Sequence, residues 1–421
     1  FRHRKMTKEI KTITLGCRLN SYESDIIKSY KNNSINKNIV VINTCAVTAE
    51  AERQGRQQVR KARKKYPEAY IMATGCAVEL DKNTWNNMPE VDKIIPNKNK
   101  LSPSLWGLKP EINNKLAIKE DASHLQSIRG HIEKTRAFIR IQNGCNHSCT
   151  FCIITVARGD SVSVPSGSII SEIKKTVSAG IQEIILTGVD LTSYGEDLPG
   201  QNNLGKLVKK ILKLVPELQR LRISSLDAAE IDNDLMEAFK TEKRLMPHLH
   251  LSLQSHDDII LKRMKRRHST KDAEKLINRL KEIRPNILFG ADLIAGFPTE
   301  NELAFKNTLN SIEKLNLTFL HVFPYSSRPE TPAARMPQLP LKEIKKRAKS
   351  LRESGAIQLK KELKNSINTF HNVLVETDTG VGHSENFLTV KVKKATERKI
   401  YKCKITGIEN NMLIGDIHES I

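Results

Sequence analysis

The chain has 421 residues, which at about 150 residues per domain predicts about three domains and a sizeable core. Lys and Arg number 69 against 47 Asp and Glu, and this net charge of +22 indicates a polyanionic partner, with nucleic acid first. A hydrophobic fraction of 38% is typical of a globular protein, and no apolar run approaches the ~18 residues of a membrane span. We therefore expect no membrane association. The basic first residues lead into no apolar stretch, so we expect no secretory signal either.

Three short apolar runs in the N-terminal region each lead into a turn that carries a cysteine. They cover residues 12–15, 39–42 and 70–73, and the turns read LGC, NTC and TGC. A helical stretch from Thr48 to Tyr66 separates the second run from the third, as in a parallel βαβ crossover. If the first run joins the same sheet, the three cysteines lie at the carboxyl ends of strands, where open α/β sheets bind ligands. The alternative is three buried structural thiols, which the repetition after three strands disfavours.

Two further N-terminal segments have distinctive composition. The sequence RQGRQQVRKARKK at 53–65 carries seven cations and no acid. Two explanations of this charge are equally favoured: the cations form a solvated helix face, or they contact phosphate groups. Residues 81–130 contain scattered prolines and polar residues, and this composition predicts a linker between domains.

From residue 137 onward, short apolar strands alternate with helical stretches. Six strands are expected, at 137–142, 183–188, 220–225, 248–253, 287–296 and 319–324. This alternation predicts an α/β fold with a parallel sheet, open or rolled into part of a barrel. Each strand ends in polar or small residues, so the six loops that follow are expected to converge on one site.

The first of these loops holds the most specific motif in the chain, which is Cys145-x-x-x-Cys149-x-x-Cys152. Three thiolates this close can bind three corners of a four-iron cluster and leave one iron open to a small molecule. A zinc ion is the alternative, because His147 or His131 offers a fourth ligand for a tetrahedral site. The position of the motif at the end of the first β/α strand favours iron–sulfur.

Short alternating apolar and polar runs begin near Asn368 and predict a small antiparallel barrel or sheet. Lysines on the outer face of such strands suit contact with an RNA backbone. The seventh cysteine, Cys403, lies in one of these runs and is expected to be a packing residue. Seven cysteines are too few for a disulfide scaffold, and an odd number of them cannot all form pairs.

The motif CNHSCTFC, followed by six β/α units, resembles the radical S-adenosylmethionine enzymes. The resemblance narrows to the methylthiotransferases because of three upstream motifs, LGCRLN, VINTC and TGC. Within that family, the chain is most similar to the branch that acts on N6-threonylcarbamoyladenosine in tRNA. The segments that carry this similarity are LTGVDLTSYGED, LQS, LIAGFPTENE and HVFPYSSRPETPAARMP. The resemblance covers nearly the whole chain. It implies an N-terminal α/β methylthiotransferase domain with a parallel sheet (8–110), a partial (β/α)6 radical-SAM barrel (131–362) and a small all-β TRAM-like barrel (366–421).

The resemblance also implies cofactors and their ligands. Two [4Fe–4S] clusters are expected, one bound by Cys145, Cys149 and Cys152 and an auxiliary one bound by Cys17, Cys45 and Cys76. In the family, the first cluster cleaves S-adenosyl-L-methionine to a 5′-deoxyadenosyl radical, and the auxiliary cluster supplies the sulfur. The strand-end residues expected to contact the cofactor are Gly188, Ser225, Gln254, Asp292 and Tyr325. Arg266 or Arg267, in a basic run at 262–268 expected to be helical, is a candidate ligand for phosphate or for the cofactor carboxylate.

The implied activity is insertion of a methylthio group at C2 of N6-threonylcarbamoyladenosine at position 37 of tRNA, in the anticodon loop. The implied partners are tRNA and an electron donor such as a flavodoxin or ferredoxin, and the expected compartment is the cytoplasm. Alternatives within the family are methylthiotransferases acting on isopentenyladenosine of tRNA or on a ribosomal-protein aspartate. An alternative of another class is a non-catalytic RNA-binding protein that holds zinc.

Overall fold

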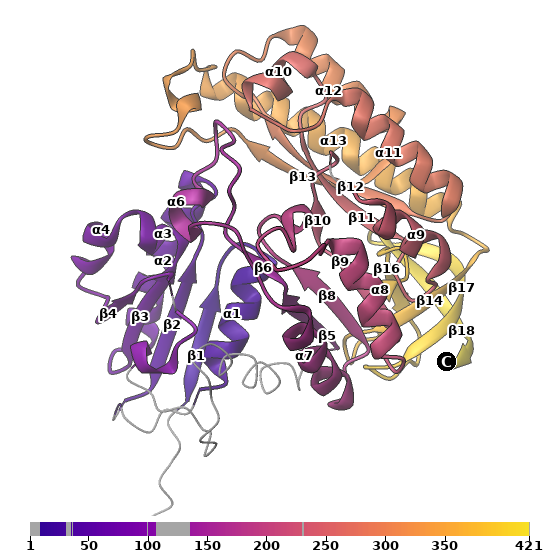
Figure 1. Ribbon diagram of the computed structural model, residues 1–421, viewed down its shortest axis with the longest axis horizontal. Coiled ribbons are helices and arrows are strands. Elements are labelled where there is room, and N and C mark those ends of the chain that lie inside the picture. Colours follow the sequence, from indigo (N-terminus) through magenta and orange to yellow (C-terminus); the bar gives the residue numbers. More distant parts are fainter. Residues whose placement is uncertain are drawn as a thin grey trace, which may run out of the picture.

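The computed structural model describes residues 9–30, 35, 37–98, 100–106, 135–229 and 231–420. Three parts follow one another along the chain: an N-terminal parallel sheet, a central series of strands and helices, and a C-terminal barrel of short strands (Figure 1). The predicted domain boundaries at 110 and 131 lie outside the described residues, as does His131. None of the helices in these described ranges is long and apolar enough to cross a membrane.

Four parallel strands form the N-terminal sheet and pair in chain order. They are β1 (Ile10–Thr14), β2 (Ile39–Thr44), β3 (Tyr70–Gly75) and β4 (Lys93–Ile95), and the helices are α1 (Arg18–Lys28), α2 (Ala49–Lys65), α3 (Cys76–Leu80) and α4 (Lys82–Asn86). Val40 and Ile42 of β2 pack in the core that includes α2, whereas Ile39 and Val41 pack in the core that includes α1. Burial on both faces explains the continuous apolar run. The three predicted strands and the predicted helix are confirmed.

Part of the predicted linker belongs to this N-terminal unit instead. Residues 81–106 contain α4, β4 and a 3-10 turn at Pro103–Trp106. Trp85 and Trp106 are each 1% exposed, and Trp106 Nε1 donates a hydrogen bond to the carbonyl oxygen of Lys100 (2.7 Å). The linker prediction was therefore wrong for 81–106, because two tryptophans bury a segment whose other residues are mostly polar. Residues 107–134 lie outside the described part.

The central strands pair in parallel and in chain order, within two adjoining groups. The first group is β5 (Arg136–Arg140), β8 (Glu183–Thr187) and β9 (Arg220–Ile223), and the second is β10 (Ser225–Leu226), β11 (His248–Gln254), β12 (Leu288–Ala295) and β13 (Leu317–Pro324). The associated helices are α6 (Ile154–Arg158), α7 (Ser166–Ser178), α8 (Leu204–Leu214), α9 (Asn233–Thr241), α10 (Asp258–Arg263), α11 (Thr270–Ile283), α12 (Glu302–Lys314) and α13 (Leu341–Asn365). All six predicted strands are present, and the arrangement is the predicted partial β/α barrel.

Each central strand turns one face toward the surrounding helices and one face inward. In β11, Leu249, Leu251 and Leu253 are fully buried in the main core, which also contains residues from α7, α8, α9, α11, α12 and α13. Because side chains alternate along a strand, His248 and His250 lie on the opposite, inner face. The inner faces therefore hold polar and charged residues.

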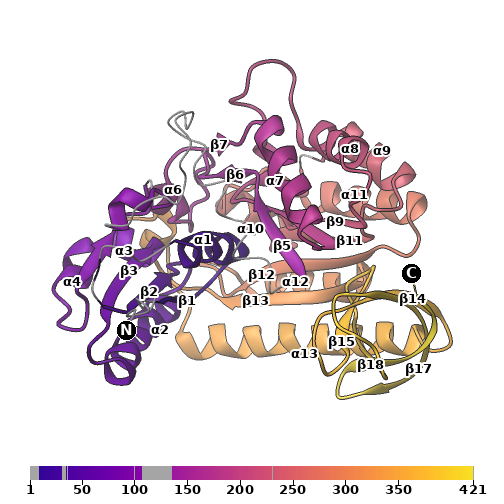
Figure 2. The same cartoon turned by 90° about the horizontal axis from the view of Figure 1, so that it is seen from below.

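Five strands close the C-terminal barrel, in the order β14-β15-β16-β18-β17. They are β14 (Phe370–Val375), β15 (Val381–Ser384), β16 (Thr389–Val392), β17 (Ile400–Glu409) and β18 (Met412–Ser420). The predicted small all-β barrel is confirmed, and Cys403 lies fully buried in its core, as expected. Arg220, the first residue of β9, donates hydrogen bonds to the carbonyl oxygens of Asn372 (2.7 Å) and His383 (3.2 Å). The barrel is thus docked at the amino-terminal ends of the central strands (Figure 2).

Candidate active site

The compact cysteine triple (Cys145, Cys149 and Cys152) lies in the loop between β6 (Gln142–Asn143) and α6. Gly144 begins this loop with φ of 73°. A Cβ atom at this position would lie 1.8 Å from the carbonyl oxygen of Asp160. Only glycine fits such a left-handed position under a neighbouring backbone, so this glycine shapes the loop.

Two arginines face the compact triple. Arg266 Nη1 lies 3.3 Å from the sulfur of Cys149. Arg267 Nη2 donates to both carboxylate oxygens of Asp190 at 3.1 Å, and Asp190 Oδ2 lies 3.9 Å from the sulfur of Cys145. The predicted candidates Arg266 and Arg267 are therefore at the cysteine loop, and a negatively charged group bound there would meet their cationic side chains.

The two carboxylates that bind these arginines, Asp190 and Asp227, were not predicted from the sequence. Arg266 Nη2 donates to Asp227 (2.6 Å), and Nδ1 of the buried His268 lies 3.0 Å from the other oxygen of Asp227. Burial would raise the pKa of Asp227, but hydrogen bonding to His268 and the charge of Arg266 hold it well below its usual range. The signal was available, because Asp190 and Asp227 each follow a central strand. The predicted helix at 262–268 was wrong beyond Arg263, where α10 ends and a turn to α11 begins.

The spacing of the sulfurs tests whether the compact triple suits a cluster or a zinc ion. Burial raises the pKa of Cys152 to about 11, and the charges of the neighbouring Cys149 and Cys145 add to the rise. In the described part of the chain, however, neither triple has all three sulfurs within 4.8 Å of one another, and His147 completes no such group. Sulfurs on one zinc ion lie about 3.8 Å apart, because Zn–S bonds of about 2.3 Å meet at tetrahedral angles. A cluster distributes its thiolates over separate irons, so it does not need so close an approach.

The dispersed triple (Cys17, Cys45 and Cys76) gathers at the carboxyl ends of β1, β2 and β3. Cys17 precedes α1, Cys45 follows β2, and Cys76 begins α3. Burial raises the pKa of Cys45 to about 11, and the charges of Cys17 and Cys76 also raise it. A Cβ atom on Gly16 would lie 2.7 Å from the sulfur of Cys45, so the backbone approaches this thiol closely. The structure brings together the three cysteines that the strand order predicted.

A buried polar network connects the two triples. Arg158 ends α6, the helix that follows the compact triple, and its Nη1 donates to Glu23 Oε1 of α1 (2.9 Å). Lys100 Nζ pairs with the other oxygen of Glu23 at 2.5 Å, and all three side chains are 3% exposed. The charge of Arg158 also acts on Cys17 and Cys76. The network therefore ties the helix after the compact triple to the dispersed triple, where its buried cations would offset the negative charge of a bound cluster.

This network predicts an acid-sensitive stability. Burial would raise the pKa of Glu23, but the charges of Arg158 and Lys100 lower it from 4.5 to about 2. A depressed carboxylate stabilises the fold above its unfolded pKa and loses that contribution as the pH falls through its folded pKa. We expect the Glu23 contribution to the free energy of unfolding, about 3 kcal/mol, to disappear between pH ~4.5 and pH ~2. Denaturant unfolding of Glu23→Gln should depend less steeply on pH than that of the wild type, and equal slopes would contradict this.

Two of the predicted cofactor-contacting residues lie at strand ends of the first half of the barrel. A Cβ atom on Gly188 would lie 2.7 Å from Leu191 Cδ2 and 3.0 Å from the carbonyl oxygen of Gln142. Packing within the protein thus explains this glycine, and its contact with the cofactor stays a prediction. Ser225 begins β10, pairs with His250 in register and is partly exposed.

The other three residues lie in the second half. Gln254 ends β11 with φ of 66°, a left-handed conformation that is uncommon for a residue with a side chain and clusters at functional sites. Asp292 lies within β12, on its inner face, so its prediction as a strand-end residue was wrong, because the strand continues to Ala295. Tyr325 follows β13. The ring of Tyr325 packs edge-on against Phe297 (centroids 5.7 Å apart), which packs likewise against Phe151 of the cysteine loop (6.3 Å). Tyr325 therefore belongs to the apolar cluster beneath that loop.

A parallel partial barrel whose first strand leads into a three-cysteine loop is the arrangement of the radical S-adenosylmethionine class of enzyme. The Radical SAM superfamily matches residues 139–312, and the uncharacterized protein family UPF0004 matches residues 9–96. By sequence, the chain belongs to the MtaB family of radical S-adenosylmethionine methylthiotransferases. S-adenosylmethionine and [4Fe–4S] clusters are the cofactors of this family.

Two of the similar proteins carry the MtaB name, and a third carries a different name. The threonylcarbamoyladenosine tRNA methylthiotransferase MtaB of Rickettsia prowazekii is 47% identical over 95% of this chain and 96% of its own length. The protein of the same name from Aquifex aeolicus is 34% identical over 81% of this chain and 86% of its own. The tRNA-2-methylthio-N(6)-dimethylallyladenosine synthase of Ehrlichia canis is 32% identical over 78% of this chain and 79% of its own.

Proposed function

We propose that the protein is a tRNA-modifying transferase that inserts a methylthio group at C2 of N6-threonylcarbamoyladenosine at position 37. The observation that carries the proposal is the pair of cysteine triples joined by the Glu23–Arg158–Lys100 network. A relative named for this substrate, 47% identical over 95% of the chain, supports the choice of base. Such a base lies in the anticodon loop, where an unpaired nucleotide is splayed into a pocket at low cost.

The two triples take different roles in this proposal. Cys145, Cys149 and Cys152 bind the cluster that holds S-adenosylmethionine, and the dispersed triple binds the auxiliary cluster. Bound there, these groups supply reductive cleavage of the cofactor and the sulfur for transfer. The chain holds the compact triple in the loop between β6 and α6, and the dispersed triple at the carboxyl ends of β1, β2 and β3. Arg266 and Arg267 lie beside the compact triple. Gly188, Ser225, Gln254, Asp292 and Tyr325 are the proposed cofactor contacts.

We assign the three parts of the chain to the proposed domains: 8–110 to the auxiliary cluster, 131–362 to the radical-SAM core and 366–421 to tRNA binding. Exposed lysines on the C-terminal barrel support this last role, because they suit backbone contact with RNA. They are Lys391, Lys393, Lys394, Lys399 and Lys404. A flavodoxin or ferredoxin is the proposed electron donor and the cytoplasm the proposed compartment, because a reducing environment preserves exposed clusters.

The basic helix α2 contributes less free charge than its sequence suggests. Arg53 donates to Glu50 at 2.7 and 2.6 Å, and Arg63 pairs with Asp92 at 2.5 Å. Lys61 and Lys64 are exposed and remain candidates for phosphate contact. Acids outside 53–65 therefore offset part of the positive charge of this helix.

Mass spectrometry of tRNA nucleosides tests the proposed function. Deletion of the gene is expected to remove 2-methylthio-N6-threonylcarbamoyladenosine and to leave its unmethylthiolated precursor. The wild-type gene should restore the modified nucleoside, whereas Cys149→Ala should not. An unchanged nucleoside in the deletion strain would refute the substrate. Loss of a methylthiolated isopentenyladenosine would favour the other tRNA substrate instead.

A further inference from the structure

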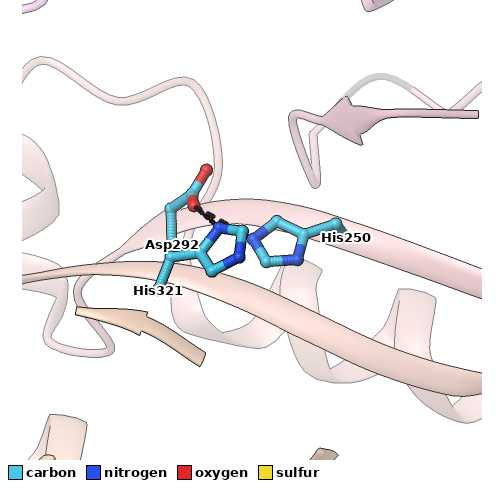
Figure 3. Close-up of side chains that lie close together, drawn as sticks. All are labelled: His250, Asp292 and His321. Carbon is cyan, nitrogen blue, oxygen red and sulfur yellow. Dashed lines mark hydrogen bonds and ion pairs between the residues drawn. The ribbon is translucent and has the colours of Figure 1, made fainter. Parts of the chain in front are cut away.

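Three polar side chains meet on the inner face of β11, β12 and β13. Asp292 Oδ1 lies 3.0 Å from His250 Nε2 and 3.2 Å from His321 Nδ1, and the centroids of the two imidazole rings lie 4.5 Å apart (Figure 3). Asp292 and His321 are direct partners in the pairing of β12 with β13, so their side chains leave the same face of the sheet side by side. Two imidazoles and one carboxylate form a ligand set that binds divalent transition metal ions.

The distances between these three groups match those between the ligands of one metal ion. Zn–N and Zn–O bonds of about 2.0–2.1 Å that meet at tetrahedral angles place two ligand atoms about 3.3 Å apart. The two contacts to Asp292, at 3.0 and 3.2 Å, are close to this value, and all three ligand atoms lie within 4.8 Å of one another. Among the residues that the structure describes, no other group of three His, Cys, Asp or Glu side chains meets this limit.

A glycine on the neighbouring strand gives His250 the room to reach Asp292. Gly290 of β12 pairs with His250 in register, two residues before Asp292. A Cβ atom on Gly290 would lie 2.3 Å from His250 Nδ1 and 2.9 Å from the carbonyl oxygen of Phe319. The imidazole therefore lies across β12, an orientation that a side chain at position 290 would block. Metal-bound histidines usually donate their second N–H to an acceptor, and this carbonyl oxygen borders the same space as Nδ1.

The three side chains also offer the charge and the open position that a bound metal ion needs. Burial would raise the pKa of Asp292, but the two histidines hold it well below the usual range, so its carboxylate is ionised. On binding a metal ion, the two facing nitrogens would present their lone pairs, and each ring would carry its proton on its other nitrogen. The His250 side chain is 6% exposed and that of His321 is 58% exposed, so solvent reaches the group from the His321 side. Water from that side would complete a tetrahedral site.

We propose that His250, Asp292 and His321 bind one zinc ion, with water as the fourth ligand. Zinc suits this set because it accepts imidazole and carboxylate together, whereas magnesium and calcium prefer oxygen ligands alone. The site is separate from both cysteine triples, since His250 lies four residues, or about 13 Å, before the carboxyl end of β11. Asp292 is then a metal ligand rather than a cofactor contact, in keeping with its place three residues, or about 10 Å, before the end of β12. Zinc binding here does not depend on which adenosine the enzyme modifies.

Zinc binding to the anaerobically reconstituted holoenzyme tests the proposed site. The holoenzyme is equilibrated with Zn²⁺, desalted and analysed for zinc, iron and sulfide, and X-ray absorption at the zinc edge identifies the ligand atoms. The wild type is expected to retain about one zinc ion per chain without losing iron. Its ligands should be nitrogen and oxygen at about 2.0–2.1 Å, with no sulfur at about 2.3 Å. The absence of sulfur distinguishes this site from zinc that has displaced iron at the cysteines.

Variants of the ligands connect the zinc ion to these residues. His321→Ala and Asp292→Asn should each weaken zinc binding by at least about 10- to 100-fold, the loss that follows when only an outer contact of a metal ligand is removed. Competition with a chelator measures this change, and the exposed position of His321 makes its variant the one least able to disturb folding. His418→Ala, at an exposed histidine of β18, is the matched control and should bind zinc as the wild type does. Failure of the wild type to retain zinc, sulfur among the zinc ligands, or unchanged binding by His321→Ala would each overturn the site and leave a hydrogen-bonded cluster only.

Discussion

Cys149→Ala is expected to abolish cleavage of S-adenosylmethionine, whereas Cys45→Ala is expected to leave some cleavage and to stop methylthio insertion. The reason is the separation of the two triples. Loss of Cys149 removes one of three ligands from the site that holds the cofactor. Loss of Cys45 affects only the triple on the N-terminal sheet.

The measurement is 5′-deoxyadenosine formed per turnover, with methylthiolated RNA quantified in the same reaction. Cys403→Ala is the matched control, because Cys403 is fully buried in the C-terminal barrel, away from both triples. It should retain both products and lose stability only. Equal cleavage by the wild type and Cys149→Ala would contradict the assigned roles.

Glu183→Ala is expected to lower the free energy of unfolding by about 3–5 kcal/mol, the cost of removing one partner from a buried ion pair. Glu183 is fully buried and accepts from Arg222 Nε (2.9 Å) and Nη2 (3.3 Å). Burial would raise its pKa, but the charge and hydrogen bonds of Arg222 lower it to about 2. Arg220 also lies within ion-pair distance, at 3.7 Å. The alanine variant therefore leaves two buried guanidinium groups without their acid.

Anaerobic denaturant unfolding at pH 7 measures this effect. Glu183→Gln keeps the shape and a hydrogen-bond acceptor, so its loss should be smaller than that of alanine. Because Arg220 also hydrogen-bonds the C-terminal barrel, the alanine variant should expose that barrel to proteolysis earlier than the glutamine variant does. A loss below about 1 kcal/mol for Glu183→Ala would show that the arginines find other partners.

The strands and both cysteine triples were predictable because their signals are local. Apolar runs such as 39–42 identify buried strands, and a cysteine directly after each run places the sulfur at a sheet edge. Parallel strand order then brings Cys17, Cys45 and Cys76 together without knowledge of any side-chain contact.

The buried polar contacts were not predictable from one sequence. Glu23, Lys100 and Arg158 come from three distant segments, and each reads as an ordinary surface charge until the fold brings them within hydrogen-bond distance. The same holds for His250, Asp292 and His321. Only Asp292 was singled out from the sequence, because the alternation that turns all three inward is visible only once the strands are paired.

Metal and sulfide analysis of anaerobically reconstituted protein tests the central claim most directly. Two separate thiolate triples predict two four-iron clusters per chain, with sulfide equal to iron, and each of Cys149→Ala and Cys45→Ala should lose about half of both. Stoichiometric zinc without acid-labile sulfide would contradict the account.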